Sequence, residues 1–209
     1  MTAYDIQVQN FIKRSYALLS PQNVKNMKPN IQIFSDEIEI ANGLGKKLKS
    51  IIHSNNKKGR NTYILLSGGN TPKKIFQAIA DQYSSKIDWS KTHFFWVDER
   101  CVPSDNPESN YGQANQYFFQ KISIPVHNVH PIIGDNHPYL EADRYSTLVN
   151  KTFSERDFVP VFDLIILGMG SDGHTASIFP NQMDLFDSNR LYEVAEHPES
   201  GQKRITVTG

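Results

Sequence analysis

The sequence predicts an α/β fold in which a mostly parallel sheet is covered by helices on its faces. Beyond a polar stretch at residues 20–30, short apolar runs of strand length alternate with longer segments whose apolar residues recur at helical spacing. The chain has 209 residues, of which 38% are hydrophobic, so it can bury a core, and its length favours one domain. We therefore expect a single globular unit built from alternating strands and helices.

The first predicted strand covers residues 31–34, and a helix is expected to follow it. Ser35 is a suitable N-cap for this helix, and Asp36 and Glu37 in its first turn favour the positive end of the helix dipole. The side chains expected on its buried face are apolar and lie at helical spacing: Ile38, Ala41, Leu44, Leu48 and Ile51.

Two further strands and a helix complete the first half of the chain. Residues 63–66 form a predicted strand, and Thr71 with Pro72 starts a helix because proline suits the first helical position. The buried stripe of that helix consists of Ile75, Phe76 and Ile79. Residues 93–97 form the next strand, which ends at Asp98-Glu99-Arg100, and the proline, aspartate and asparagine residues at 103–107 predict a loop after it.

The second half of the chain contains two predicted helices, at residues 110–119 and 139–153. Residues 161–167 are the most apolar stretch of the sequence, which is typical of a fully buried central strand. Residues 204–208 are expected to form the last strand. Strands therefore alternate with helices through most of the chain, as a parallel sheet requires.

Charge and cysteine content argue against several classes of function. The 22 basic and 22 acidic residues cancel, so neither nucleic acid nor a membrane surface is an expected partner. Cys101 is the only cysteine, and the chain lacks the Cys/His spacing of a zinc site, so we expect no metal. No apolar run reaches the ~18 residues that cross a bilayer, and the pattern of a signal peptide is absent. We therefore expect a soluble protein in the cytoplasm.

A glycine-rich turn follows the strand at residues 63–66. In it, Ser67 and Asn70 flank Gly68 and Gly69, and the two glycines let backbone N–H groups approach a ligand closely. The helix that begins there directs its positive end at the same point, which suits a phosphate. A tight turn without a ligand explains the residues equally well. The turn lacks the lysine of a P-loop, which disfavours hydrolysis of a nucleoside triphosphate.

A charged segment ends the strand at residues 93–97. It contains Asp98, Glu99 and Arg100, and the planar guanidinium of Arg100 can hold a phosphate through two parallel hydrogen bonds. Surface charges with a local Asp/Arg pair are the alternative interpretation. Only the neighbouring glycine turn favours the functional one, since ligands of α/β sheets bind at the carboxyl ends of strands.

A third segment, at residues 167–180, combines three glycines with a carboxylate and an imidazole. Gly170 and Gly173 bracket Asp172, and His174 follows directly. An imidazole accepts a proton from water near neutral pH, and a nearby carboxylate can orient it. The remaining histidines have no comparable surroundings and are interpreted as structural or solvent-exposed: His53, His93, His127, His130, His137 and His197. His174 is therefore the candidate general base.

Together these three segments resemble the 6-phosphogluconolactonase family. That family shares a Rossmann-like fold with glucosamine-6-phosphate deaminases and, more distantly, with ribose-5-phosphate isomerases. The resemblance covers residues 31–209 and includes the Ser109-Asn110-Tyr111 run. Residues 1–30 lie outside it and form an N-terminal extension, in which apolar residues between positions 4 and 19 predict a helix.

The resemblance implies hydrolysis of 6-phospho-D-glucono-1,5-lactone, a phosphorylated sugar lactone, in the oxidative pentose phosphate pathway, with no cofactor. His174 would take a proton from the attacking water, and Asp172 would orient it. N–H groups near Gly170 and Gly173 are the expected donors to the oxyanion at C1. The expected phosphate-binding residues lie in the other two segments: Ser67, Gly68, Gly69, Asn70 and Arg100.

Two further site residues follow from the resemblance. Asp98 aligns with the carboxylate that the related deaminases use for proton transfer at carbon 2, a step that a lactone does not need. Arg204 matches a position near the phosphate, although an ordinary charged strand end explains it equally well. The chain ends at Gly209, where family members continue through a strand and a helix that carries a lysine, so we expect exposed core surface and one phosphate contact fewer.

Two alternative functions stay open at this point. A glucosamine-6-phosphate deaminase/isomerase of the same fold would use the same phosphate site and Asp98, although the continuation Arg100-Cys101-Val102-Pro103 resembles the lactonase version. A non-catalytic, truncated homologue that binds sugar phosphates is the alternative from another class. The oligomeric state does not follow from the residues.

Overall fold

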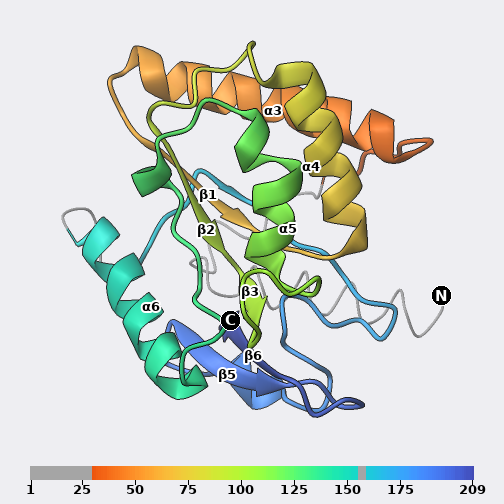
Figure 1. The fold of residues 1–209 in the computed structure, drawn as a ribbon, viewed down its shortest axis with the longest axis vertical. Coiled ribbons are helices and arrows are strands. Elements are labelled where there is room, and N and C mark those ends of the chain that lie inside the picture. The colour runs from red at the N-terminus through yellow and green to blue at the C-terminus, as the bar shows by residue number, and fades with distance from the viewer. Residues whose placement is uncertain (1–29, 155–158) are drawn as a thin grey trace.

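A computed structural model describes residues 30–154 and 159–209 of the chain. The predicted helix between positions 4 and 19 lies outside these residues. Figure 1 shows the elements, which follow one another as α3 (Glu37–Lys57), β1 (Thr62–Leu66), α4 (Asn70–Tyr83), β2 (Thr92–Trp96), β3 (Asp98–Arg100), α5 (Asn110–Tyr117), α6 (Pro138–Phe153), β4 (Leu164–Ile165), β5 (Tyr192–Glu196) and β6 (Lys203–Val207). Three short 3-10 helices lie between them, at Phe119–Lys121, Val126–Asn128 and Met183–Leu185.

The first sheet is parallel, with the strand order β2-β1-β4. Ile64 at its centre pairs with Phe94 on one side and with Leu164 on the other. All five residues of β1 are buried, because helices α3 and α4 pack together against this region (Figure 1). The predicted α/β fold with a parallel sheet flanked by helices is therefore confirmed.

Helix α3 begins one residue later than the predicted cap implies. Asp36, not Ser35, is its N-cap, and the Asp36 carboxylate accepts a hydrogen bond of 2.8 Å from the N–H of Glu39. The strand predicted at residues 31–34 is wrong, since these residues pair with no strand among those that the structure describes. Apolar side chains alone do not make a strand when no neighbour supplies the hydrogen bonds.

The prediction of a buried central strand at residues 161–167 is also wrong. Only Leu164 and Ile165 of this segment pair with β1. Among the residues that the structure describes, β4 is an edge strand of the sheet. The exposed fractions are 64% for Val161, 50% for Ile165 and 46% for Leu167. An apolar composition alone therefore does not make a segment a buried central strand.

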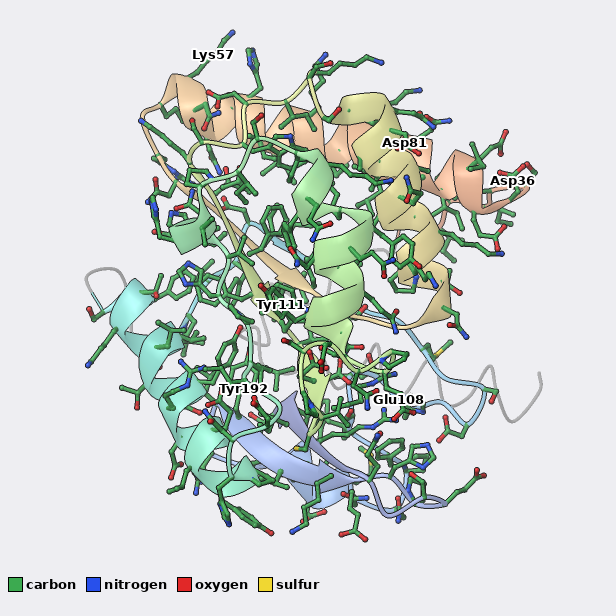
Figure 2. The ribbon with its side chains drawn as sticks, in the orientation of Figure 1. Asp36, Lys57, Asp81, Glu108, Tyr111 and Tyr192 are labelled. Atoms are coloured by element: carbon green, nitrogen blue, oxygen red, sulfur yellow. The ribbon has the colours of Figure 1, made fainter. Side chains whose placement is uncertain are left out.

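A second sheet, which the sequence did not predict, is antiparallel and has the order β3-β6-β5. Residues 98–100, which were expected only as the end of the strand before them, form its strand β3, and β5 was not expected at all. Helix α6 covers this sheet, and Tyr192 of β5 lies near that helix (Figure 2). Its ring meets the ring of Tyr145 from α6 edge to face, with 4.8 Å between the ring centres. The Tyr192 hydroxyl donates to the carbonyl of Trp96, which links the second sheet to the end of β2.

None of the helices described is both long enough and apolar enough to cross a membrane.

A pair of histidines beside β2 predicts a pH-dependent stability. Nδ1 of His93 lies 3.1 Å from Nε2 of His130, and burial, together with the nearby His93 and His127, lowers the pKa of His130 to about 4. In the unfolded chain, His130 therefore binds a proton near the ordinary histidine pKa of about 6.5. In the folded chain, it binds that proton only near pH 4. We expect the free energy of unfolding to fall as the pH drops through this window.

Urea denaturation of the native chain and of His130→Asn between pH 7.5 and 4.5 checks this expectation. The loss of stability on acidification should be smaller in His130→Asn, because that variant has no imidazole at this position to titrate. An equal loss in the two proteins would contradict the assignment to His130.

Candidate active site

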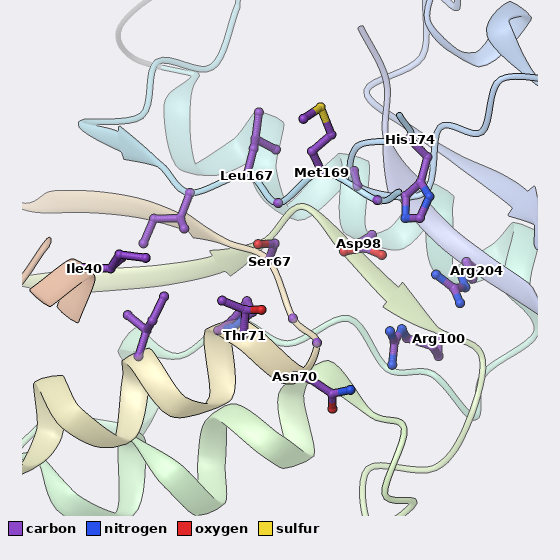
Figure 3. Close-up of a pocket in the computed structure, with 18 of the residues that line it drawn as sticks. Ile40, Ser67, Asn70, Thr71, Asp98, Arg100, Leu167, Met169, His174 and Arg204 are labelled. Carbon is purple, nitrogen blue, oxygen red and sulfur yellow. The ribbon is translucent and has the colours of Figure 1, made fainter. Parts of the chain in front are cut away.

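Most of the predicted site residues line one cavity of about 510 Å³ (Figure 3). It lies where β1 and β4 of the parallel sheet end and where β3 begins, which is the usual ligand position in an α/β fold. The predicted residues that line it are Ser67, Gly68, Gly69, Asn70, Asp98, Arg100, Gly170, His174 and Arg204. Asp172 and Gly173 do not line it, but they belong to the same loop as His174.

The two glycines of the turn after β1 are required for different reasons. Gly69 has φ +111°, a conformation that side chains rarely adopt. A Cβ at Gly68 would lie 1.9 Å from Oδ1 of Asn110, so no side chain fits there. Gly69 is also the N-cap of α4 and offers no side-chain acceptor. The first backbone N–H groups of α4 are therefore available to an anion.

We expect Gly68→Ala to disrupt this turn. Asn110 is 2% exposed and its amide nitrogen donates to the carbonyl of Asp98 at 2.9 Å, so it cannot easily move away from the new methyl group. Overpacking of this kind costs about 1–3 kcal/mol of unfolding free energy. Gly168→Ala is the matched control, because a Cβ there meets only the Ser67 hydroxyl, at 4.0 Å. Urea denaturation of both variants measures the difference, and equal stability would contradict the steric argument.

Arg100 and Arg204 lie side by side because β3 and β6 pair antiparallel with these two residues in register (Figure 3). Nη1 of Arg100 donates to the carbonyl of Glu108 at 2.5 Å. The Nε atoms of both arginines and the hydroxyl of Ser67 are buried and have no hydrogen-bond partner in the described part of the chain. Burial and the adjacent Arg100 lower the pKa of Arg204. A bound dianion would satisfy these donors and relieve the repulsion between the two cations.

His174, which lines the cavity, forms a hydrogen-bonded pair with Asp172 behind it in the same loop. Nδ1 of His174 lies 2.6 Å from Oδ1 of Asp172, and the His174 N–H also donates to that oxygen, at 3.3 Å. Burial opposes ionisation of Asp172, but these hydrogen bonds outweigh it and lower the pKa of its carboxyl group. An ionised acceptor at Nδ1 favours the tautomer with its proton there. Nε2 of His174 is then free to accept a proton.

Gly170 and Gly173 shape the loop and offer no free donors. A Cβ at Gly170 would lie 2.3 Å from the His174 ring, and Gly173 has φ +89°. The N–H of Gly170 donates to the carbonyl of His174 at 2.9 Å, and the N–H of Gly173 donates to the carbonyl of Gly170 at 3.0 Å. The loop thus uses both of these N–H groups, and the expectation that N–H groups near Gly170 and Gly173 stabilise an oxyanion stays a prediction.

Phe179 is a site residue that the sequence did not single out. Its ring lies 4.8 Å from the ring of His174, and the guanidinium carbon of Arg204 lies 5.6 Å from its centre. Phe179 is 1% exposed, so a buried ring supports both groups. Its position five residues after His174 gave no signal, because a lone aromatic residue in an apolar run is ordinary core.

Glu99 is a second residue whose role the sequence did not reveal. It is 1% exposed, and its carboxylate accepts hydrogen bonds from the backbone N–H groups of Arg100, Asn110 and Tyr111 and from the Ser109 hydroxyl. Burial raises the pKa of Glu99 to about 7, although the backbone donors oppose this shift. Glu99 therefore caps α5 from outside that helix and fixes Asn110 against Gly68.

The described residues contain no cluster of three or more histidine, cysteine, aspartate or glutamate side chains suited to hold a metal ion. The cavity instead contains one imidazole, which a carboxylate orients, and a group of donors suited to an anion. Chemically, this arrangement can hold a phosphorylated molecule by one end and move a proton at the other.

Comparison with known proteins identifies relatives of this chain. Residues 35–209 match the family model described as glucosamine-6-phosphate isomerases/6-phosphogluconolactonase. The 6-phosphogluconolactonase of Haemophilus influenzae is 47% identical over 147 residues, which are 70% of this chain and 61% of that protein. The 6-phosphogluconolactonase of Treponema pallidum is 37% identical over 171 residues, which are 82% of this chain and 71% of that protein.

Solved structures agree with these relatives. A crystal structure described as devB protein has a TM-score of 0.78 at 43% identity and covers 85% of this chain and 73% of its own. The 6-phosphogluconolactonase from Trypanosoma cruzi has a TM-score of 0.76 at 30% identity, with 87% and 75% covered. The chain spans about 61% of the length of some curated relatives. The resemblance inferred from the three segments is confirmed, and the chain belongs to the glucosamine-6-phosphate isomerase/6-phosphogluconolactonase family.

Proposed function

We propose that this protein hydrolyses 6-phospho-D-glucono-1,5-lactone to 6-phospho-D-gluconate, a step of the oxidative pentose phosphate pathway. The observation that carries the proposal is a single cavity that holds two kinds of group. One is the His174 imidazole, oriented by Asp172, and the other is a set of buried hydrogen-bond donors without a partner among the described residues, which suit a phosphate. The names of the relatives in Haemophilus influenzae and Treponema pallidum support the same reaction. The ligand is then a small phosphorylated sugar lactone, and the balanced net charge gives no reason to expect a nucleic acid.

The 6-phosphate is assigned to the part of the cavity between the turn after β1 and the two arginines. There the first N–H groups of α4, the Ser67 hydroxyl and the Asn70 side chain meet the guanidinium groups of Arg100 and Arg204. Charge-assisted hydrogen bonds from guanidinium to phosphate are the strongest of these contacts. This anchoring leaves the lactone ring to extend across the cavity toward His174.

The chemical step follows from the tautomer of His174. Its Nε2 takes a proton from water while the water oxygen adds to C1 of the lactone, and Asp172 stabilises the imidazolium that forms. When the tetrahedral adduct collapses, the bond between C1 and the ring oxygen breaks. The imidazolium returns its proton to that oxygen, which leaves a hydroxyl group on C5 and a carboxylic acid at C1. This ester cleavage transfers no electrons, so we propose that it needs no cofactor.

We assign the catalytic domain to residues 31–209 and treat residues 1–30 as an N-terminal extension, in agreement with the family match over residues 35–209. We also propose a cytoplasmic location. The single cysteine, Cys101, supports it because disulfide-bonded proteins of oxidising compartments carry paired cysteines.

Hydrolysis of the lactone, corrected for its spontaneous opening, tests the proposed function. The rate above the uncatalysed background should rise in proportion to enzyme concentration. Release of ammonia from glucosamine 6-phosphate would instead support the deaminase alternative. Calorimetric binding of 6-phosphogluconate without lactone turnover would support a non-catalytic sugar-phosphate binder.

A further inference from the structure

Ser177 connects the loop that carries His174 to the second sheet. Its side chain is fully buried, and its hydroxyl donates to Oδ2 of Asp98 on β3 at 2.7 Å. Its backbone N–H donates to the hydroxyl of Thr206 on β6 at 3.1 Å. Asp98 and Thr206 are themselves register partners across β3 and β6. Ser177 is therefore bonded to both strands of one ladder step.

The same two strands position the proposed phosphate-binding residues. Arg100 lies two residues beyond Asp98 on β3, and Arg204 lies two residues before Thr206 on β6. In a strand, residues two apart point to the same face of the sheet. The bonds of Ser177 consequently tie the His174 loop to the ladder that carries both guanidinium groups.

The backbone between His174 and Ser177 is held in an unfavourable conformation. Ala176 has φ +49°, the only positive value at a residue other than glycine in the described ranges. Such a conformation persists where surrounding contacts over-determine it. The turn lets His174 line the cavity while Ser177, three residues later, is directed into the interior. Loss of the Ser177 bonds would remove a contact that maintains this reversal.

The carboxylate of Asp98 is already used within the protein. It is 5% exposed, Oδ2 accepts from Ser177, and Oδ1 lies 3.4 Å from the amide nitrogen of Asn110. That amide nitrogen also donates to the Asp98 carbonyl at 2.9 Å. A carboxylate in this state is better suited to anchor neighbours than to exchange protons with a ligand.

We propose that Ser177 is a positioning residue for His174, and that Asp98 is its anchor and not a proton-transfer group. The inference rests on the proposed lactonase function. The phosphate is held by β3 and β6, so the distance from C1 of the lactone to Nε2 of His174 depends on how the loop is fixed to these strands. A displacement of the base by about 1 Å can cost on the order of 100-fold in rate. Binding of the phosphate does not depend on this distance.

Ser177→Ala tests the inference through the split between kcat and KM. We expect kcat to fall by about 10-fold to 100-fold and KM to change by less than about 3-fold, because the base moves while the phosphate site stays. Ser177→Cys keeps a weaker donor of similar size and should recover part of kcat. Ser188→Ala is the control, since that hydroxyl bonds to Glu193 outside the cavity and its loss should leave kcat unchanged.

Variants of Asp98 distinguish an anchor from a proton-transfer group. If Asp98 and Ser177 act through their mutual bond, Asp98→Ala and Ser177→Ala lower kcat by similar factors and the double variant lowers it little further. Asp98→Asn should recover most of the kcat that Asp98→Ala loses. The amide oxygen can still accept from Ser177 in place of Oδ2. The new NH₂ group replaces Oδ1, whose only hydrogen bond within the described residues is the long one of 3.4 Å from the amide nitrogen of Asn110, so little is lost there.

The outcomes separate this inference from the proposed function. If the native protein does not hydrolyse the lactone, the function fails. If the native protein is active and Ser177→Ala keeps its kcat, or loses kcat and 6-phosphogluconate affinity together, the positioning role is overturned. The positioning role would also be overturned if Asp98→Asn were as inactive as Asp98→Ala. An amide can replace an anchoring carboxylate, but it cannot replace one that carries a proton.

Discussion

His174→Ala is expected to lower kcat for lactone hydrolysis by about 100-fold to 10,000-fold, the usual contribution of a general base. Affinity for 6-phosphogluconate should stay within about 3-fold of native, since the base acts on water and not on the phosphate, which is assigned to Arg100, Arg204 and the turn after β1. A timed hydrolysis assay with subtraction of spontaneous opening measures kcat, and calorimetry measures the affinity. This split between catalysis and binding is the direct consequence of a base that does not hold the phosphate.

His53→Ala is the matched control for that experiment. His53 is an exposed histidine of α3 and does not line the cavity, so its removal should leave both quantities unchanged. Parallel loss of kcat and of 6-phosphogluconate affinity in His174→Ala would show that His174 supports the architecture of the site instead of acting as its base.

Arg100→Ala is expected to raise KM by about 10-fold to 100-fold, because a hydrogen bond to a charged group contributes about 1.5–3 kcal/mol. The kcat value should change much less, since the guanidinium binds the phosphate in the substrate and in the transition state alike. Arg100→Lys should recover only part of the affinity, because an ammonium group cannot make two parallel hydrogen bonds. Steady-state kinetics over a range of lactone concentrations provides both constants.

Arg190→Ala controls for the general effect of removing a positive charge. Arg190 pairs with Asp143 and Glu193 outside the cavity, and its loss should not alter KM. An unchanged KM in Arg100→Ala would remove Arg100 from the proposed phosphate site. Its pairing with Arg204 would then need another explanation.

The local parts of the site could be predicted because the chain itself brings their members together. Asp172 and His174 are two residues apart, and the glycines of the turn after β1 are required by backbone conformation and by close packing. Such requirements depend on a few neighbouring residues. A single sequence can therefore indicate them without knowledge of the sheet.

The errors occurred where an apolar pattern depends on distant partners. Residues 31–34 and 161–167 have the composition of strands, but hydrogen-bonding neighbours decide whether such a segment joins a sheet and whether it is central. For the same reason, the charged run at residues 98–100 gave no sign of being a strand. Its partner strand, β6, lies about a hundred residues later in the sequence, at Lys203–Val207.

The sequence by itself indicated the α/β class, the pairing of the candidate base His174 with Asp172, and the glycine turn, since each of these rests on local periodicity or on the conformational demands of a few neighbouring residues. Only the tertiary structure decided that Arg100 stands beside Arg204 and that Ser177 bonds to Asp98, which is 79 residues away in the chain. Those contacts follow from the register of the antiparallel ladder. Register is set by packing over a whole face and not by any local pattern.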